Sequence, residues 1–210
     1  MSQSPNMLSL DVDQQRQLKR LVLEDRPYID RVSVGLCLLL LQIRQARNED
    51  GIIIMEMDAL EGLAPTSTRR PASKFLHPPL APLWHKHVFM PRHVVSNLGV
   101  HWGFLNKQHL PVEEQGNKRL DRMINDVFSR HDEVTDDFIR DITAEFIDKP
   151  FWRRMDDGAT GDWLIFAQHQ SQNYYLHYTE HSRSAEDDVR IRDYLRRTAM
   201  AEFPFLFEEA

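Results

Sequence analysis

The sequence has few of the features that assign a protein to a broad class at once. It contains one cysteine, Cys37, which cannot form an internal disulfide and fits a reducing compartment. Its longest apolar run, Val34–Leu41, has eight residues, against the roughly 20 that cross a bilayer. The first residues carry no positive charge ahead of an apolar run, so we expect no signal peptide. We therefore expect a cytoplasmic protein that does not enter a membrane.

Several motifs that identify common enzymes are also missing. The chain has no Walker phosphate-binding loop, no GxGxxG, no GxSxG, no HExxH and no CxxC pair. These absences exclude most nucleotide-driven, nicotinamide-dependent and standard hydrolase mechanisms, and we expect no cofactor. The composition is that of a globular protein, with 41% hydrophobic and 28% charged residues, and 210 residues suffice to bury a core. We expect a single domain over residues 1–210.

Acidic residues are absent from the central segment 62–112, although the whole chain has a net charge of −6. This segment holds six Lys and Arg residues and six of the ten histidines. A net negative chain argues against general nucleic-acid binding, whereas a cationic segment suits a local anion site. Arginine binds phosphate bidentately and lysine acts as a point charge. We therefore expect phosphate to be bound by Arg69, Arg70, Lys74, Lys86 and Arg92.

Hydrophobic periodicity predicts helices at both ends of the chain and in its centre. Asp11 can cap a first helix and Pro27 can open a second, so the N-terminal helices span about residues 11–47. Among the central helices, we expect one to end at Pro150, because proline interrupts helical hydrogen bonding. Ser184 can cap the last helix.

Short segments rich in β-branched and aromatic residues predict four strands, at 52–57, 84–89, 163–169 and 174–180. The last two are expected to form a hairpin. Strands and helices do not alternate regularly, which favours an α+β fold over a parallel α/β sheet. We expect a small, mainly antiparallel sheet packed against several helices, with a long helix at 28–47 covering its apolar face.

The strand predicted at 84–89 contains the sequence Trp84-His-Lys-His87. Side chains alternate along a strand, so His85 and His87 share one face. Two such histidines can act as a general acid and a general base, or can bind zinc. The alternative is a solvated strand edge with a few polar residues, and the lack of nearby acids favours the functional interpretation.

The predicted helix after Pro91 carries a second polar group. His93, Asn97 and His101 are spaced four residues apart and therefore lie on one helix face. We expect this polar face either to belong to the site or to be exposed to solvent.

The second strand of the predicted hairpin carries a third group. Alternation places Tyr175, His177 and His181 on one face, and the more apolar face with Tyr174 is expected to cover the core.

The hairpin Trp163-Leu-Ile-Phe-Ala…Tyr174-Tyr-Leu-His-Tyr-Thr-Glu-His181 resembles the terminal strands of RelE-type ribonucleases, in the group that includes barnase and colicin-type RNases. The resemblance covers about twenty residues. It implies a small antiparallel sheet with helices on one side that cuts RNA without a metal. By resemblance, Tyr175, His177 and His181 would belong to the site. RelE-type toxins are short and basic, whereas this chain is long and acidic, which argues against direct ribosome binding.

The leading hypothesis is a metal-independent ribonuclease, toxin-like and bacterial, in which His85 and His87 perform acid–base chemistry and His181, Tyr175 or His177 completes the site. One alternative is a non-catalytic protein that binds nucleic acid or an acidic protein partner through residues 69–109. Another is a histidine metal site built from His85, His87 and His177 or His181.

Overall fold

The computed structural model describes residues 10–66, 68, 70–105, 111–114, 117–157, 161–182 and 184–207. The described residues fall into two compact units. Unit 1 lies within Met1–Ser67, Ala72–Val88 and Asp162–Ala210, and unit 2 within Thr68–Pro71 and Phe89–Gly161. The expectation of one domain over 1–210 stays a prediction, and each unit is described by itself.

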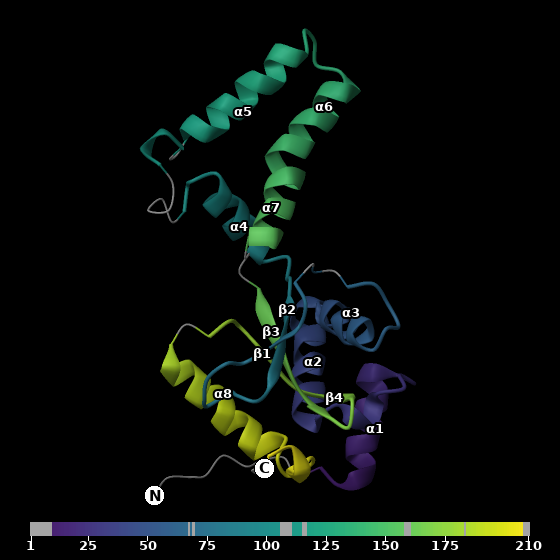
Figure 1. Ribbon diagram of the computed structural model, residues 1–210. Helices are drawn as coiled ribbons and strands as arrows, with labels where there is room; N and C mark the ends of the chain where they lie inside the picture. Colours follow the sequence, from purple (N-terminus) through teal and green to yellow (C-terminus); the bar gives the residue numbers. More distant parts are fainter. Residues whose placement is uncertain are drawn as a thin grey trace, which may run out of the picture. The chain divides into compact units, whose positions relative to one another are not determined.

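Unit 1 contains a four-stranded antiparallel sheet in the order β1-β2-β3-β4 (Figure 1). The strands are β1 (Ser73–Lys74), β2 (Trp84–Val88), β3 (Asp162–His169) and β4 (Gln172–Thr179). The last two form the predicted hairpin, and its two turn residues, Gln170 and Ser171, both have positive φ. Two-residue turns of this kind match the natural twist of a hairpin. Together with the surrounding helices, this sheet confirms the α+β prediction.

Helices cover both faces of the sheet (Figure 1). On one face, Trp163 and Ile165 of β3 pack with Ile191 and Leu195 of α8 (Ala185–Thr198). The other face is covered by the helices α2 (Val34–Arg47) and α3 (Asp50–Leu60), with α1 (Val12–Leu23) packed against α2. The expected packing of the long N-terminal helix on the sheet is confirmed by the contacts of α2 with β4.

Ser33 joins the start of α2 to the outer edge of β4. Its hydroxyl accepts a hydrogen bond from the Leu36 backbone N–H at 3.1 Å, which caps the helix, and donates one to the Leu176 carbonyl at 2.8 Å. The Ser33 backbone N–H donates to the Tyr175 carbonyl at 2.9 Å. The strand is irregular at this point, because Ile165 pairs with His177 while Phe166 pairs with Tyr175. Leu176 is thus an extra residue, a β-bulge whose carbonyl is satisfied by Ser33.

We expect the substitution Ser33→Ala to lower the free energy of unfolding by about 2–4 kcal/mol, which combines a lost N-cap with a buried carbonyl left without a donor. Chemical denaturation of both proteins measures the difference. Ser184→Ala is the matched control, because Ser184 caps α8 in an exposed position through a 3.2 Å bond from Asp187 N–H. It should cost about 1 kcal/mol. Equal losses in the two variants would contradict the role assigned to the Leu176 contact.

Two sequence predictions in unit 1 are wrong. Residues 52–57, predicted as a strand, lie in α3, where Ile53, Ile54 and Met57 form one buried helix face. A short apolar run cannot be assigned from its periodicity, and packing overrides β propensity. The helix expected at 28–47 begins at Val34, because Val32 and Ser33 are extended beside β4 and only Ile29–Arg31 forms a short 3₁₀ turn.

Unit 2 is helical in the part that the structure describes. Its elements are α4 (His93–His101), a 3₁₀ turn at Val112–Glu114, α5 (Asn117–Arg130), α6 (Asp136–Thr143), a π-helical segment at Ala144–Asp148 and α7 (Lys149–Asp157). The prediction that a helix ends at Pro150 is wrong, since Pro150 lies in the first turn of α7. The π-helical segment Ala144–Asp148 directly precedes α7, and proline is tolerated in the first turn of a helix. In the residues described, no helix combines the length and the apolar character needed to cross a membrane.

Candidate functional site

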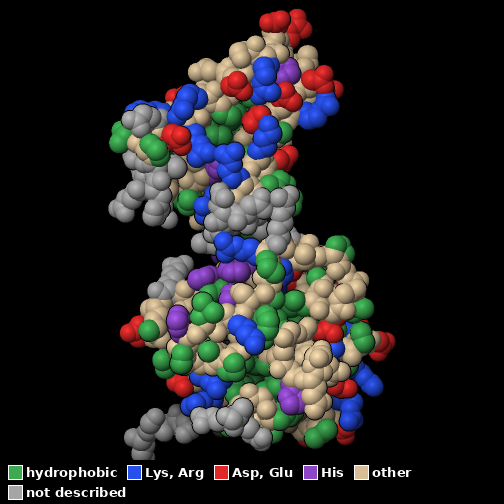
Figure 2. All heavy atoms as spheres, viewed as in Figure 1, with side chains coloured by type: hydrophobic (Ala, Val, Ile, Leu, Met, Phe, Trp, Pro, Cys, Tyr) green, Lys and Arg blue, Asp and Glu red, His purple; other side chains and the backbone are tan. Residues whose placement is uncertain are grey.

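The histidines of β2 lie on the sheet face that is turned toward α8. His85 is paired with Ile165 and His87 with Trp163 across the β2–β3 ladder, and directly paired residues point to the same side. The expected alternation therefore holds, with Trp84 and Lys86 on the opposite face. Figure 2 shows histidine side chains (purple) gathered on this unit.

His181 joins the two β2 histidines from the segment that follows β4. Its ring centroid lies 4.1 Å from that of Trp163 and 5.8 Å from that of His87. The rings of His85 and His87 are 5.4 Å apart. Phe75 packs against His85 at 4.5 Å and against Trp163 at 5.1 Å. We call His85, His87 and His181 the histidine cluster. Trp163 packs against the rings of His85 and His181.

The members of the histidine cluster differ in their electrostatic environment. Burial, with a smaller contribution from the charge of His181, lowers the pKa of His85 to about 4, so this ring is neutral at pH 7. The Nδ1 atom of His181 lies 2.7 Å from the Ser182 carbonyl, which can only accept a hydrogen bond. Nδ1 of His181 is therefore the protonated nitrogen, and in the neutral ring Nε2 carries the free lone pair.

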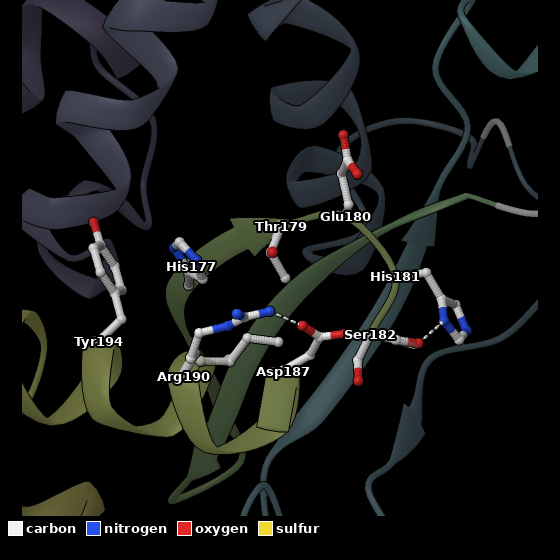
Figure 3. A pocket seen from close by; sticks show the side chains of 9 residues that line it. His177, Thr179, Glu180, His181, Ser182, Asp187, Arg190 and Tyr194 are labelled. Atoms are coloured by element: carbon white, nitrogen blue, oxygen red, sulfur yellow. Dashed lines mark hydrogen bonds and ion pairs between the residues drawn. The ribbon is translucent and has the colours of Figure 1, made fainter. Parts of the chain in front are cut away.

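A pocket of about 400 Å³ opens beside His181, between the end of β4 and the start of α8 (Figure 3). His177 and Thr179 of β4 line it with Arg190 and Tyr194 of α8. The His177 ring packs on Tyr194 with centroids 4.3 Å apart, and burial lowers the pKa of His177 to about 4. Arg190 forms an ion pair with Asp187 at the mouth of the pocket (Figure 3).

Buried ring nitrogens of this region include some without a hydrogen-bond partner among the residues that the structure describes, such as Nδ1 of His85, Nδ1 of His177 and Nε1 of Trp163. Most buried polar atoms in folded proteins are paired, so unpaired ones are expected where a ligand or water completes the site. The region therefore combines a pocket that contains an arginine with polar atoms that a ligand can satisfy.

Sequence reasoning missed two residues of this region. Trp163 was assigned only to the hairpin, and Arg190 was hidden among the charged residues of an amphipathic helix. No spacing pattern links either residue to the histidines. Only the strand register brings Trp163 to His87, and only the packing of α8 brings Arg190 to β4.

Two predicted site residues lie on the opposite face of the sheet. Tyr175 is completely buried, and its hydroxyl donates a 2.7 Å hydrogen bond to Glu61, the residue that follows α3. The bulge at Leu176 breaks the alternation and separates Tyr175 from His177. Lys86 is also buried, with Nζ 3.7 Å from a carboxylate oxygen of Glu56. The expected position of Tyr175 beside His177 is wrong. Lys86 lies on the face that strand alternation predicts, and its role in phosphate binding stays a prediction.

The other predicted cations lie on the other face of the sheet, in unit 2 or outside the described residues. Lys74 lies over the Trp84 ring at 5.1 Å, on the face away from His85. Arg69 lies outside the described residues, and Arg70 and Arg92 belong to unit 2.

The polar stripe predicted in α4 is part of unit 2 as well. Asn97 and His101 are buried, whereas Val95 is 79% exposed. Of the two expected alternatives, exposure to solvent does not hold for Asn97 and His101, and membership of a site stays a prediction. His93 is partly buried. The helix turns this side inward because Trp102, at its end, packs on Phe146 and donates a hydrogen bond to the Phe146 carbonyl.

No group of three or more His, Cys, Asp or Glu residues that could hold a metal ion occurs within the described part of the chain. The histidine cluster contains no carboxylate that could act as a further ligand. The proposed set of His85, His87 and His177 or His181 is therefore not arranged as a metal centre here.

The buried histidines of unit 1 predict a pH-dependent stability. His85 and His177 bind a proton near pH 6.5 when unfolded but only near pH 4 when folded. The unfolded chain therefore binds more protons between these values, and their contribution is complete above pH 6.5 and lost as the pH falls toward 4. Urea midpoints measured from pH 7 to pH 4 should decrease through this window. His177→Leu should flatten the decrease, and an unchanged slope would contradict the assignment.

No protein-family model, no curated protein and no solved structure matches this chain.

Proposed function

We propose that the histidine cluster of unit 1 cleaves RNA without a metal ion. The observation that carries the proposal is the approach of His87 and His181, whose rings are 5.8 Å apart although the residues are 94 positions apart in the chain. Two imidazoles on either side of a phosphodiester are a sufficient acid–base pair for this reaction. A toxin-like biological role stays a prediction from the hairpin resemblance.

In this reaction the ribose 2′-oxygen attacks the phosphorus and the bond from phosphorus to the 5′-oxygen breaks. We assign His181 as the general base, because its Nε2 lone pair is available while Nδ1 is held by the Ser182 carbonyl. It takes the proton of the 2′-hydroxyl. His87 then acts as the general acid and gives a proton to the departing 5′-oxygen. The products are a 2′,3′-cyclic phosphate and a free 5′-hydroxyl, so atoms and protons balance.

The pocket beside His181 supplies a place for the negative charge of the phosphate. Arg190 lines it and supplies a guanidinium, whose planar N–H fork can contact phosphate oxygens. Its guanidinium can exchange part of its contact with Asp187 for phosphate oxygens, which lowers the cost of the charge that develops in the transition state. His85 and His177 are neutral at pH 7, so we assign them to positioning and hydrogen bonding rather than to proton transfer.

The direct test is an RNA cleavage assay in the presence of a chelator, with the full chain and a mixed-sequence oligoribonucleotide. We expect products that end in 2′,3′-cyclic phosphate, and no cleavage of an oligonucleotide whose 2′-hydroxyls are methylated, because the nucleophile is then blocked. Failure of the purified protein to cut RNA under these conditions would end the proposal. Binding without cleavage would favour the alternative of a non-catalytic nucleic-acid-binding protein.

A further inference from the structure

Unit 2 brings together arginines from two helices around the end of a third. Arg119 and Arg122 belong to α5, Arg153 and Arg154 belong to α7, and α4 ends at His101. The guanidinium of Arg119 donates a 2.9 Å hydrogen bond to the His101 carbonyl. Figure 2 shows Lys and Arg side chains (blue) on this unit, interspersed with Asp and Glu side chains (red). We call Arg119, Arg122, Arg153 and Arg154 the arginine cluster.

The charges of the arginine cluster are close enough to act on one another. Burial lowers the pKa of Arg119, Glu114 raises it, and the smaller effects of the charges of Arg153 and Arg122 lower it. Burial also lowers the pKa of His101 to about 4, together with the charges of Arg119, Arg153 and Arg154. The charges of three arginines thus act on His101, which disfavours further positive charge there.

Ion pairing differs among the arginines of this cluster. Glu114 lies 3.9 Å from Arg119, at the limit of an ion pair. Arg153 and Arg154 form no ion pair with any residue that the structure describes. The Nε atom of Arg154 is buried and has no hydrogen-bond partner among the same residues.

The contrast with other cations of unit 2 is sharp. Arg130 lies within 3.2–3.5 Å of carboxylate oxygens of Asp126, Asp141 and Glu145. Arg140 is paired with Asp137. The acids of this unit therefore neutralise Arg130 and Arg140, while Arg153 and Arg154 keep their charge.

We propose that the arginine cluster binds consecutive phosphate groups of a single-stranded RNA. Arginine presents a planar fork that matches two phosphate oxygens, and several adjacent forks suit a phosphate chain better than a single anion. Trp152, which precedes Arg153 on α7, is 45% exposed and can stack a base. Cationic side chains beside an exposed aromatic ring are the usual means of holding a single strand without reading its sequence.

The choice of RNA as the source of the phosphates rests on the proposed function, whereas the presence of a phosphate site does not. The two are separated by measuring affinity with an RNA that cannot be cut. A fluorescent 12-nucleotide RNA with 2′-O-methyl groups serves as the probe, because it keeps every phosphate and base but lacks the nucleophile.

The test compares wild type with the double variant Arg153→Gln, Arg154→Gln, and with Arg140→Gln as the matched control. Each lost phosphate contact is expected to weaken binding roughly tenfold. It should also reduce the slope of log affinity against log salt by about 0.7. Arg140→Gln should bind as wild type does, because Arg140 is an exposed arginine already paired with Asp137. Circular dichroism melting of each variant confirms that the helices remain folded.

Wild-type affinity in the double variant, or an equal loss in Arg140→Gln, would overturn the inference. If wild type binds the methylated RNA through these arginines but never cuts ordinary RNA, the proposed function fails and the arginine site stands. If it cuts RNA and the double variant binds the probe unchanged, this inference fails alone.

Discussion

Replacing both His87 and His181 with alanine is expected to abolish measurable RNA cleavage. Removal of a general acid or a general base lowers a rate by roughly 10²–10⁴ for each group. The two groups act in one step, so the loss in the double variant will be smaller than the product of the single losses. Single-turnover cleavage of an oligoribonucleotide in chelator gives the four rate constants, for wild type, the two single variants and the double variant.

The control for these variants is His169→Ala. His169 ends β3 of the same unit and packs against Phe205 at 4.8 Å, away from the cluster. The substitution His169→Ala removes an imidazole of unit 1 but leaves the proposed acid–base pair in place. The cleavage rate of this variant should therefore match that of wild type.

The pH profile separates chemistry from folding. His87→Ala should remove the limb of the bell-shaped profile that belongs to the acid, and His181→Ala the limb that belongs to the base. Loss of stability should be about 1 kcal/mol, as for substitutions outside the core. Cleavage rates that stay within threefold of wild type in both single variants would contradict the assignment.

The largest expected effect on stability comes from Lys86→Met. Lys86 is 3% exposed, and its partner Glu56 is completely buried. Removing the lysine takes away the ammonium group that lies 3.7 Å from the buried Glu56 carboxylate. Loss of one member of a buried ion pair typically costs about 3–5 kcal/mol. The side chain of Thr66 still donates a 2.8 Å hydrogen bond to Glu56, but a hydroxyl does not replace a full charge. Urea denaturation at pH 7 measures the loss.

Two companion variants make this result specific. The double variant Glu56→Gln, Lys86→Met removes both charges and should recover much of the stability. Removing one charge of a buried ion pair is costly, whereas removing both often changes the free energy of unfolding little. Lys74→Met changes an exposed lysine of the neighbouring strand and should cost less than about 1 kcal/mol. If Lys86→Met instead folds normally and loses RNA affinity, Lys86 binds phosphate as the sequence predicted.

The sequence was a good guide to the sheet where local patterns were strong. Alternation and turn residues place the hairpin of β3 and β4 to within two residues, and they place His85 and His87 on one face. The same method failed for α3, because three consecutive isoleucines favour a strand by propensity while their burial pattern needs a helix. Local preference and tertiary packing disagreed there, and packing prevailed.

The composition of the site was less accessible from the sequence. Strict alternation along β4 predicts Tyr175 beside His177, but one extra residue at Leu176 reverses the faces. A bulge depends on the partner strand and on Ser33, which is 143 residues away from Leu176. The burial of Lys86 depends in the same way on Glu56, in a helix that the sequence placed wrongly as a strand. A charge count cannot tell a surface cation from one paired in the interior.

The path of the chain between β2 and β3 has a consequence for how this protein can change. Val88 ends β2 and is paired directly with Asp162, the first residue of β3, so the long segment between them leaves and returns at neighbouring positions. Residues paired in an antiparallel ladder have Cα atoms only about 5 Å apart, a gap that an ordinary hairpin turn of two residues also closes. Phe89–Gly161 therefore has the topology of an insertion at the tip of the β2–β3 hairpin. Insertions are tolerated best at such loop positions. Its helices can lengthen, shorten or be exchanged in evolution while the strand register that positions the histidines is inherited unchanged.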